Sequence, residues 1–262
     1  MFIANRAHIN TIRSTFQQLQ TKPPKQVADA LERIDLLEKR VVNISASTSD
    51  LAESVTDALL RGVEPSSDPA VQQAVTANWL STLHHLPEVI TAGGQRALRD
   101  ALTANLDKII EQWNSAIGNA GNALTDLHAT LGDVDLADAA AILRLGGDAA
   151  DRWSQARSVV ARIAAAADGW STLMLFVGTS PNPIHRALRL APLTLEQFDS
   201  LPAAVDAWGL IRAGVEGVSL PTLDEYRDRI ASVEAERERP AMTLDARRSS
   251  IAGHPIMVRV RA

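Results

Sequence analysis

Apolar residues recur at alternating spacings of three and four positions over three long segments of the chain. The segments run from Val27 to Ile44, from Leu102 to Ala120 and from Trp153 to Met174. This spacing puts the apolar side chains on one face of an α-helix, whereas a strand needs an alternation of two. The chain is therefore predicted to be all-α: a bundle of long antiparallel helices, a smaller helical C-terminal part, and an extended tail ending in a short strand.

Glycines and prolines divide this pattern into separate helices. Breaks are expected at Gly62, Gly93, Gly146 and Gly178, and a loop follows at residues 179–183. Four parts are predicted: an N-terminal helical segment at 1–45, the main helical bundle at 46–178, a smaller helical part at 179–240 and an extended basic tail at 241–262. Within the smaller part, short helices are expected near 194–200, 202–213 and 221–239.

Individual helix boundaries are also readable. Asp68 followed by Pro69 is typical of an N-cap and the first helical position. The longest helix is expected from about Gln95 to Leu131. Its Gly118 and Gly121 indicate either a close approach of a neighbouring helix or a kink.

Composition limits the chemistry that the chain can perform. It has no cysteine, which excludes disulfides, thiolate zinc sites and cysteine nucleophiles. No secretory signal is readable at the N-terminus, so the expected location is the cytoplasm or an assembled particle. The least charged stretch, residues 163–185, is interrupted by Gly169 and Pro181, and a buried helix is expected there in preference to a membrane span.

Three sets of residues superficially suggest functional sites. His84, His85 and Glu88 lie one turn apart, but Pro87 interrupts them and no second motif completes a metal site. Asp133, Asp135 and Asp138 lack the later residues of a calcium loop, and helix capping is the favoured interpretation. The two Gly-Gly pairs lack the lysine of a phosphate loop. No metal and no cofactor are therefore expected.

The five tryptophans are expected in the core and not as base-stacking or interface residues. Four of them lie on apolar stripes and the fifth lies in an alanine-rich helix: Trp79, Trp113, Trp153, Trp170 and Trp208.

Both ends of the chain are basic and its body is acidic. Residues 1–50 carry a formal charge of +2, residues 246–262 carry +4, and the remainder carries −11. The last segment alternates Ile256, Val258 and Val260 with polar or larger residues, which predicts a strand that needs a partner. Because the body would repel a polyanion, an acidic protein surface is favoured over nucleic acid as the partner of this tail.

These observations favour a non-enzymatic assembly or scaffold protein of a multi-subunit particle, such as a virus-like particle, which acts through protein contacts or forms a homo-oligomer. Neither nucleic acid nor a membrane is an expected partner. The heptad seam of 27–44 faces either another copy or a helix of its own chain. The expected partner-contact residues are Ile34, Leu37, Val41, Arg247, Arg248, Val258, Arg259, Val260 and Arg261.

Two alternatives remain open at the level of the sequence. One is an enzyme with a site among the helices, whose polar groups come from His84, His85, Asp126 and His128. The other is a regulator that binds nucleic acid through the basic ends of the chain.

Overall fold

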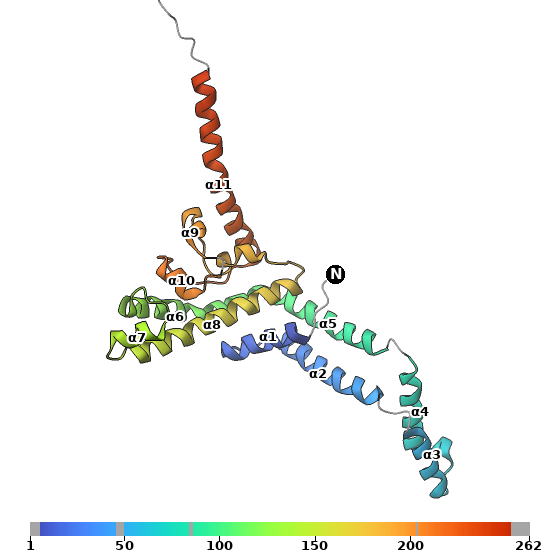
Figure 1. Ribbon diagram of the computed structural model, residues 1–262. Helices are drawn as coiled ribbons and strands as arrows, with labels where there is room; N and C mark the ends of the chain where they lie inside the picture. The colour runs from blue at the N-terminus through green and yellow to red at the C-terminus, as the bar shows by residue number, and fades with distance from the viewer. Residues whose placement is uncertain (1–5, 46–49, 84–85, 203, 253–262) are drawn as a thin grey trace, which may run out of the picture. The chain divides into compact units, whose positions relative to one another are not determined.

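The computed structural model describes residues 6–45, 50–83, 86–202 and 204–252, and all regular secondary structure in these ranges is helical (Figure 1). The all-α prediction is confirmed for this part of the chain. The described residues form two compact units. The first unit takes residues 6–10, 22–109 and 176–178, and the second takes residues 11–21, 110–175 and 179–252.

The α-helices are α1 (Arg6–Gln18), α2 (Lys25–Ser45), α3 (Asp50–Leu60), α4 (Pro69–Ser81), α5 (Leu86–Ala104), α6 (Leu106–Leu131), α7 (Ala139–Leu145), α8 (Ala149–Phe176), α9 (Leu195–Ser200), α10 (Ala207–Arg212) and α11 (Leu223–Ala252). Short 3-10 helices lie at η1 (Pro65–Ser67), η2 (Pro183–His185) and η3 (Ala187–Arg189).

In the first unit, α2 packs along α5. Gly94 lies in the middle of α5, and a Cβ placed on it would lie 3.1 Å from Cδ1 of Leu37 and 3.4 Å from Cγ1 of Ile34. The break predicted at Gly93 is therefore wrong. The helix continues through both glycines because the missing side chain at Gly94 lets α2 approach closely.

The same unit contains a hairpin of α3 and α4. Gly62, with a φ of 71°, follows α3 as predicted. Asp68 caps α4 by accepting hydrogen bonds from the backbone N–H groups of Ala70 (2.8 Å) and Val71 (3.4 Å), which confirms the predicted cap. Nη2 of Arg61 also donates to this carboxylate at 2.8 Å.

The long helix predicted from Gln95 to Leu131 is interrupted at Asn105, where α5 ends and α6 begins. Nδ2 of Asn105 donates to the carbonyl oxygen of Ala101, as asparagine commonly does at helix ends. Gly118 and Gly121 lie inside α6 without ending it. A Cβ on Gly121 would lie 3.4 Å from the backbone nitrogen of Val218, so this glycine permits a close approach.

The core of the second unit forms around α6 and α8. Trp113, Ile117, Ile163, Trp170 and Leu173 have no exposed surface. The α8 helix is long and apolar enough to cross a membrane, but half of its most apolar window is buried within the fold. A core helix of a folded protein can be equally long and apolar. A buried helix is also what the sequence predicts for residues 163–185.

The C-terminal part of this unit is tied to α6 and α8 through side-chain hydrogen bonds to its backbone. Asn114 of α6 donates to the carbonyl oxygen of Leu220 at 2.8 Å and accepts from its N–H at 2.7 Å. Nε1 of Trp170 donates to the carbonyl oxygen of Pro221 at 2.7 Å. The three short segments predicted in this region correspond to α9, to a shorter α10, and to α11.

The predicted extended tail differs from the structure over residues 241–252. There α11 continues beyond Pro240 to Ala252. The residues that follow this proline include alanine, methionine, leucine and arginine, which favour the helix once the proline has been accommodated. The predicted terminal strand lies at 256–260, outside the described residues.

Candidate functional site

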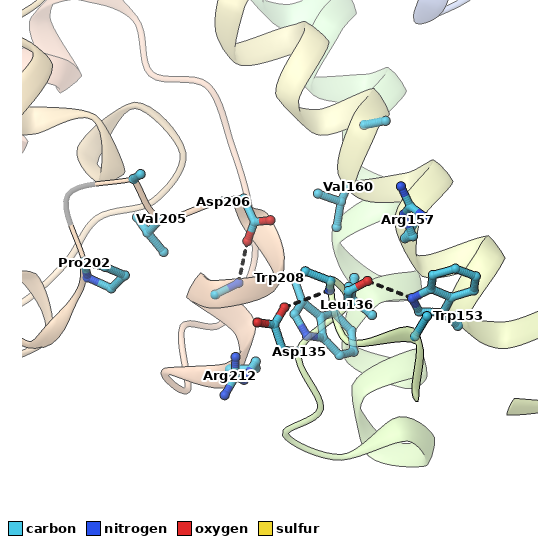
Figure 2. A pocket seen from close by; sticks show the side chains of 15 residues that line it. Asp135, Leu136, Trp153, Arg157, Val160, Pro202, Val205, Asp206, Trp208 and Arg212 are labelled. Atoms are coloured by element: carbon cyan, nitrogen blue, oxygen red, sulfur yellow. Dashed lines mark hydrogen bonds between the residues drawn. The ribbon is translucent and has the colours of Figure 1, made fainter. Parts of the chain in front are cut away.

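The second unit contains an open cleft with a volume of about 730 Å³ (Figure 2). Its walls come from the loop before α7, from α8, from the segment that precedes α10, and from α10 itself. The lining residues are Asp135, Leu136, Ala137, Ala139, Trp153, Arg157, Val160, Ala161, Pro202, Ala204, Val205, Asp206, Trp208, Gly209 and Arg212. This volume lies within the range of about 300–1,000 Å³ that is usual for small-molecule sites.

Two indole rings fix the loop before α7. Nε1 of Trp153 donates to the carbonyl oxygen of Leu136, and Nε1 of Trp208 donates to the carbonyl oxygen of Val134, both at 2.8 Å. The ring of His128 meets that of Trp208 edge to face, with centroids 5.5 Å apart. Both indole N–H groups are thus used by the protein itself, and the tryptophans contribute only apolar surface to the cleft.

The aspartates in and beside the cleft are engaged in capping. Oδ1 of Asp138 accepts from the N–H of Ala141 at the start of α7, and Oδ1 of Asp206 accepts from Gly209 in α10, both at 2.9 Å. Oδ1 of Asp135 accepts from the N–H of Ala137 at 2.8 Å. The capping interpretation is confirmed for Asp138. Among the described residues, no group of three or more His, Asp or Glu side chains could hold a metal ion.

Two arginines supply positive charge to the cleft. The guanidinium carbon of Arg157 lies 4.9 Å from the centroid of the Trp153 ring, one helical turn away on α8. Arg212 lies in the last turn of α10. Figure 2 shows the two arginines on different walls of the cleft. Both residues are exposed, and neither makes an ion pair or a side-chain hydrogen bond with another residue of the described ranges.

Among the predicted partner-contact residues, the side chains that the structure describes do not line the cleft. Ile34 is buried and Leu37 is half-buried, and both lie against Gly94 of the same chain. Val41 belongs to α2, and Arg247 and Arg248 belong to α11, but their side chains are outside the described part. The remaining predicted contacts fall in 253–262, also outside it: Val258, Arg259, Val260 and Arg261.

Of the residues proposed for an enzymatic site, the two that the structure describes, Asp126 and His128, do not line the cleft. His84 and His85 lie outside the described ranges. Asp126 is exposed on α6, and Nε2 of His128 lies 2.9 Å from Oδ1 of Asp133. The ring of His128 is therefore in contact with Asp133 in the loop before α7.

The tryptophans divide into three environments. Trp113, Trp170 and Trp208 are buried, as predicted, and Trp153 is half-buried in the cleft. Trp79 is 61% exposed, so the prediction of a core position is wrong for it. Of the α4 side chains that the structure describes, only Val71 and Ala74 are buried, because neighbouring helices cover a narrow strip of the helix.

Large apolar side chains are exposed at several positions of the first unit. They lie on and around the α3–α4 hairpin and at the start of α5: Leu59, Leu60, Val63, Val75, Trp79, Leu83 and Val89. We refer to Val75, Trp79, Leu59 and Leu60 as the hairpin surface. Val75 and Trp79 are four residues apart and therefore share a face of α4.

Neither the cleft nor the hairpin surface could be found from sequence motifs. The cleft combines residues from three separate segments, and the only local sign of it is Trp153 followed four positions later by Arg157. Comparisons of the chain with family models, with curated proteins and with solved structures found no match.

Proposed function

We propose that this chain is a non-enzymatic assembly protein of a multi-subunit particle, and that the hairpin surface forms a contact with a second copy of the chain. The observation that carries the proposal is the exposure of Trp79, Leu59 and Leu60 on two adjacent helices. Val75 and Trp79 give α4 an exposed apolar face, which is a feature of many protein–protein interfaces, and tryptophan is enriched among the residues that dominate binding energy.

Packing within the hairpin supports this proposal. The apolar residues that α3 and α4 bury in the described part of the chain are of small or medium size: Ala58, Val71 and Ala74. The largest side chains instead face outward, where water contact costs free energy in proportion to their apolar area, at roughly 25 cal/mol per Å². A second copy that covers Trp79 and Val75 would recover part of this free energy.

Of the two contacts predicted from the sequence, only the tail is part of this proposal. Ile34 and Leu37 pack inside the chain, so α2 contributes its seam to its own unit. The arginines of the tail remain a proposed second contact, in which the +4 charge of residues 246–262 meets the acidic body of another copy.

Light scattering coupled to size-exclusion chromatography tests the proposal on the full chain over a wide range of concentration. We expect the parent chain to form an oligomer whose fraction rises with protein concentration. In the double variant Val75→Ser, Trp79→Ser, the dissociation constant of this oligomer should be at least about tenfold higher. The matched control is Leu143→Ser, which removes an exposed leucine of α7 in the second unit. A parent chain that stays monomeric at millimolar concentration, or an oligomer indifferent to the double variant, would exclude this role for the hairpin surface.

Deletion of residues 247–262 tests the tail separately. If the tail contacts another copy, the deletion weakens association, and the weakening is greater at low salt than at high salt because the contact is electrostatic. An oligomer whose stability does not change on deletion would rule out the tail contact and leave the hairpin contact standing.

A further inference from the structure

We propose that the cleft of the second unit binds a small organic monoanion with a flat apolar body, and that Arg157 holds its carboxylate. This inference concerns the second unit alone and does not depend on the hairpin surface or on the oligomeric state.

The charge on Arg157 is available to a ligand. Its guanidinium carbon lies 4.9 Å from the centroid of the Trp153 ring, a cation–π distance. The guanidinium group is planar and carries five N–H donors, so it can contact the ring and still present donors to a carboxylate. Because no described residue accepts a hydrogen bond from these N–H groups, they can bind a carboxylate through two parallel hydrogen bonds.

The surroundings of Arg157 favour an apolar body attached to that carboxylate. Trp153 is half-buried and presents its ring to the cleft, with Val160 and Leu136 among the neighbouring lining residues. The opposite wall includes Pro202 and Val205. Figure 2 shows these apolar side chains on both sides of the cleft. Since the indole N–H groups already have partners, these walls offer contact surface without further hydrogen-bond donors.

The remaining charges of the cleft restrict the ligand to one anionic group. Arg212 adds a second positive charge from α10, but Asp135 and Asp206 contribute two carboxylates. Each aspartate uses one oxygen to accept a backbone hydrogen bond. A second anion at their end of the cleft would be repelled, whereas a neutral apolar body would not.

Isothermal titration calorimetry on the full chain tests this with 2-naphthoate and the neutral 2-naphthamide, which have nearly the same shape. At neutral pH and low salt, we expect naphthoate to bind at least about tenfold more tightly, the size of one charge-assisted hydrogen bond. Arg157→Gln should remove about tenfold of this affinity, and Arg212→Gln about threefold because its charge acts over a longer distance. Arg144→Gln on α7, which changes an exposed arginine outside the cleft, should leave the affinity unchanged.

Three results would overturn the proposal: no naphthoate binding at millimolar concentration, equal affinities for the acid and the amide, or an unchanged affinity in Arg157→Gln. Both substituted arginines are exposed, so thermal unfolding followed by circular dichroism should be the same in all variants. The comparison of acid with amide on the parent chain remains decisive even if a variant proves unstable.

Discussion

Among the described glycines, Gly169 leaves the least space for an added Cβ. It lies inside α8, opposite the side chain of Thr15, which is 2% exposed. A Cβ on Gly169 would lie 2.8 Å from Cβ of Thr15 and 2.5 Å from its Cγ2. The hydroxyl of Thr15 donates to the carbonyl oxygens of Thr11 and Ala165, at 2.9 Å and 3.3 Å, so this side chain cannot turn away without losing hydrogen bonds.

We therefore expect Gly169→Ala to lower the free energy of unfolding by about 1–3 kcal/mol, the usual cost of overpacking a core. Urea denaturation followed by circular dichroism measures this change. Gly118→Ala is the matched control, because Gly118 also lies inside a long helix but has open space where its Cβ would be. There the substitution should stabilise the protein by up to about 1 kcal/mol. Equal effects at the two sites would contradict the close contact at Thr15.

The same comparison shows what sequence patterns leave undetermined at single residues. Gly118, Gly121 and Gly169 all lie in helical patterns that do not distinguish them, and Gly94 belongs to a Gly-Gly pair at which the sequence predicts a break. Gly94 and Gly169 face another helix closely, whereas Gly118 does not. The difference depends on which residue the fold brings opposite each glycine, and that is a property of tertiary packing.

At the scale of helices, the sequence predicts that a helix is present better than it predicts the residues at which the helix begins and ends. The stripes of α2 and α8 and the cap at Asp68 were correctly read because they depend on local spacing and local hydrogen bonds. The sequence did not predict three other features: the division at Asn105, the continuity of α5 through Gly94 and the helix beyond Pro240. These depend on residues distant in sequence or on the sum of several weak propensities. The cleft was missed for the same reason, since Arg157 and Arg212 are 55 positions apart in the numbering and meet only in the fold.

The start of α4 should depend on pH through Asp68. The hydrogen bond from the N–H of Ala70 is the largest influence that lowers the pKa of this carboxyl below its ordinary value, and Val71 and Arg61 act in the same direction against desolvation. Because the pKa is lower in the folded than in the unfolded chain, the stabilisation is complete above about pH 4 and is lost as the pH falls through the folded-state pKa.

Asp68→Asn keeps a side chain that can cap a helix but removes the charge that Arg61 contacts. We expect the variant to be less stable than the parent at pH 7, and the difference to narrow below about pH 4, where the parent carboxyl becomes neutral. Urea denaturation at pH 7 and at pH 3 measures both differences. Asp100→Asn, at an exposed position of α5, is the control and should show no such convergence. A difference that stays constant from pH 7 to pH 3 would show that the charge of Asp68 does not stabilise the hairpin.

At the scale of the whole molecule, α1 is shared between the two units, although it is one continuous helix. Its residues from Thr11 onward, together with the turn that follows it, belong to the second unit, where Ile12, Phe16 and Leu19 are buried. The ring of Phe16 meets that of Trp113 edge to face, with centroids 5.3 Å apart. Nη2 of Arg162 donates to the carbonyl oxygen of Leu19 at 3.4 Å. The core of the second unit thus includes a segment that precedes the rest of it by about ninety residues.

A fragment of residues 110–262 lacks that segment and should therefore unfold at lower urea concentration and less cooperatively than the second unit does in the full chain. Adding a peptide of residues 6–21 should restore helicity and stability, because it supplies the apolar side chains that cover Trp113. The same peptide with Phe16→Ala should restore much less, since truncation of a buried phenylalanine costs about 3–5 kcal/mol. Circular dichroism and calorimetric titration of the peptide measure these effects. A fragment that unfolds as cooperatively without the peptide as with it would show that residues 11–21 cover this core without being needed to form it.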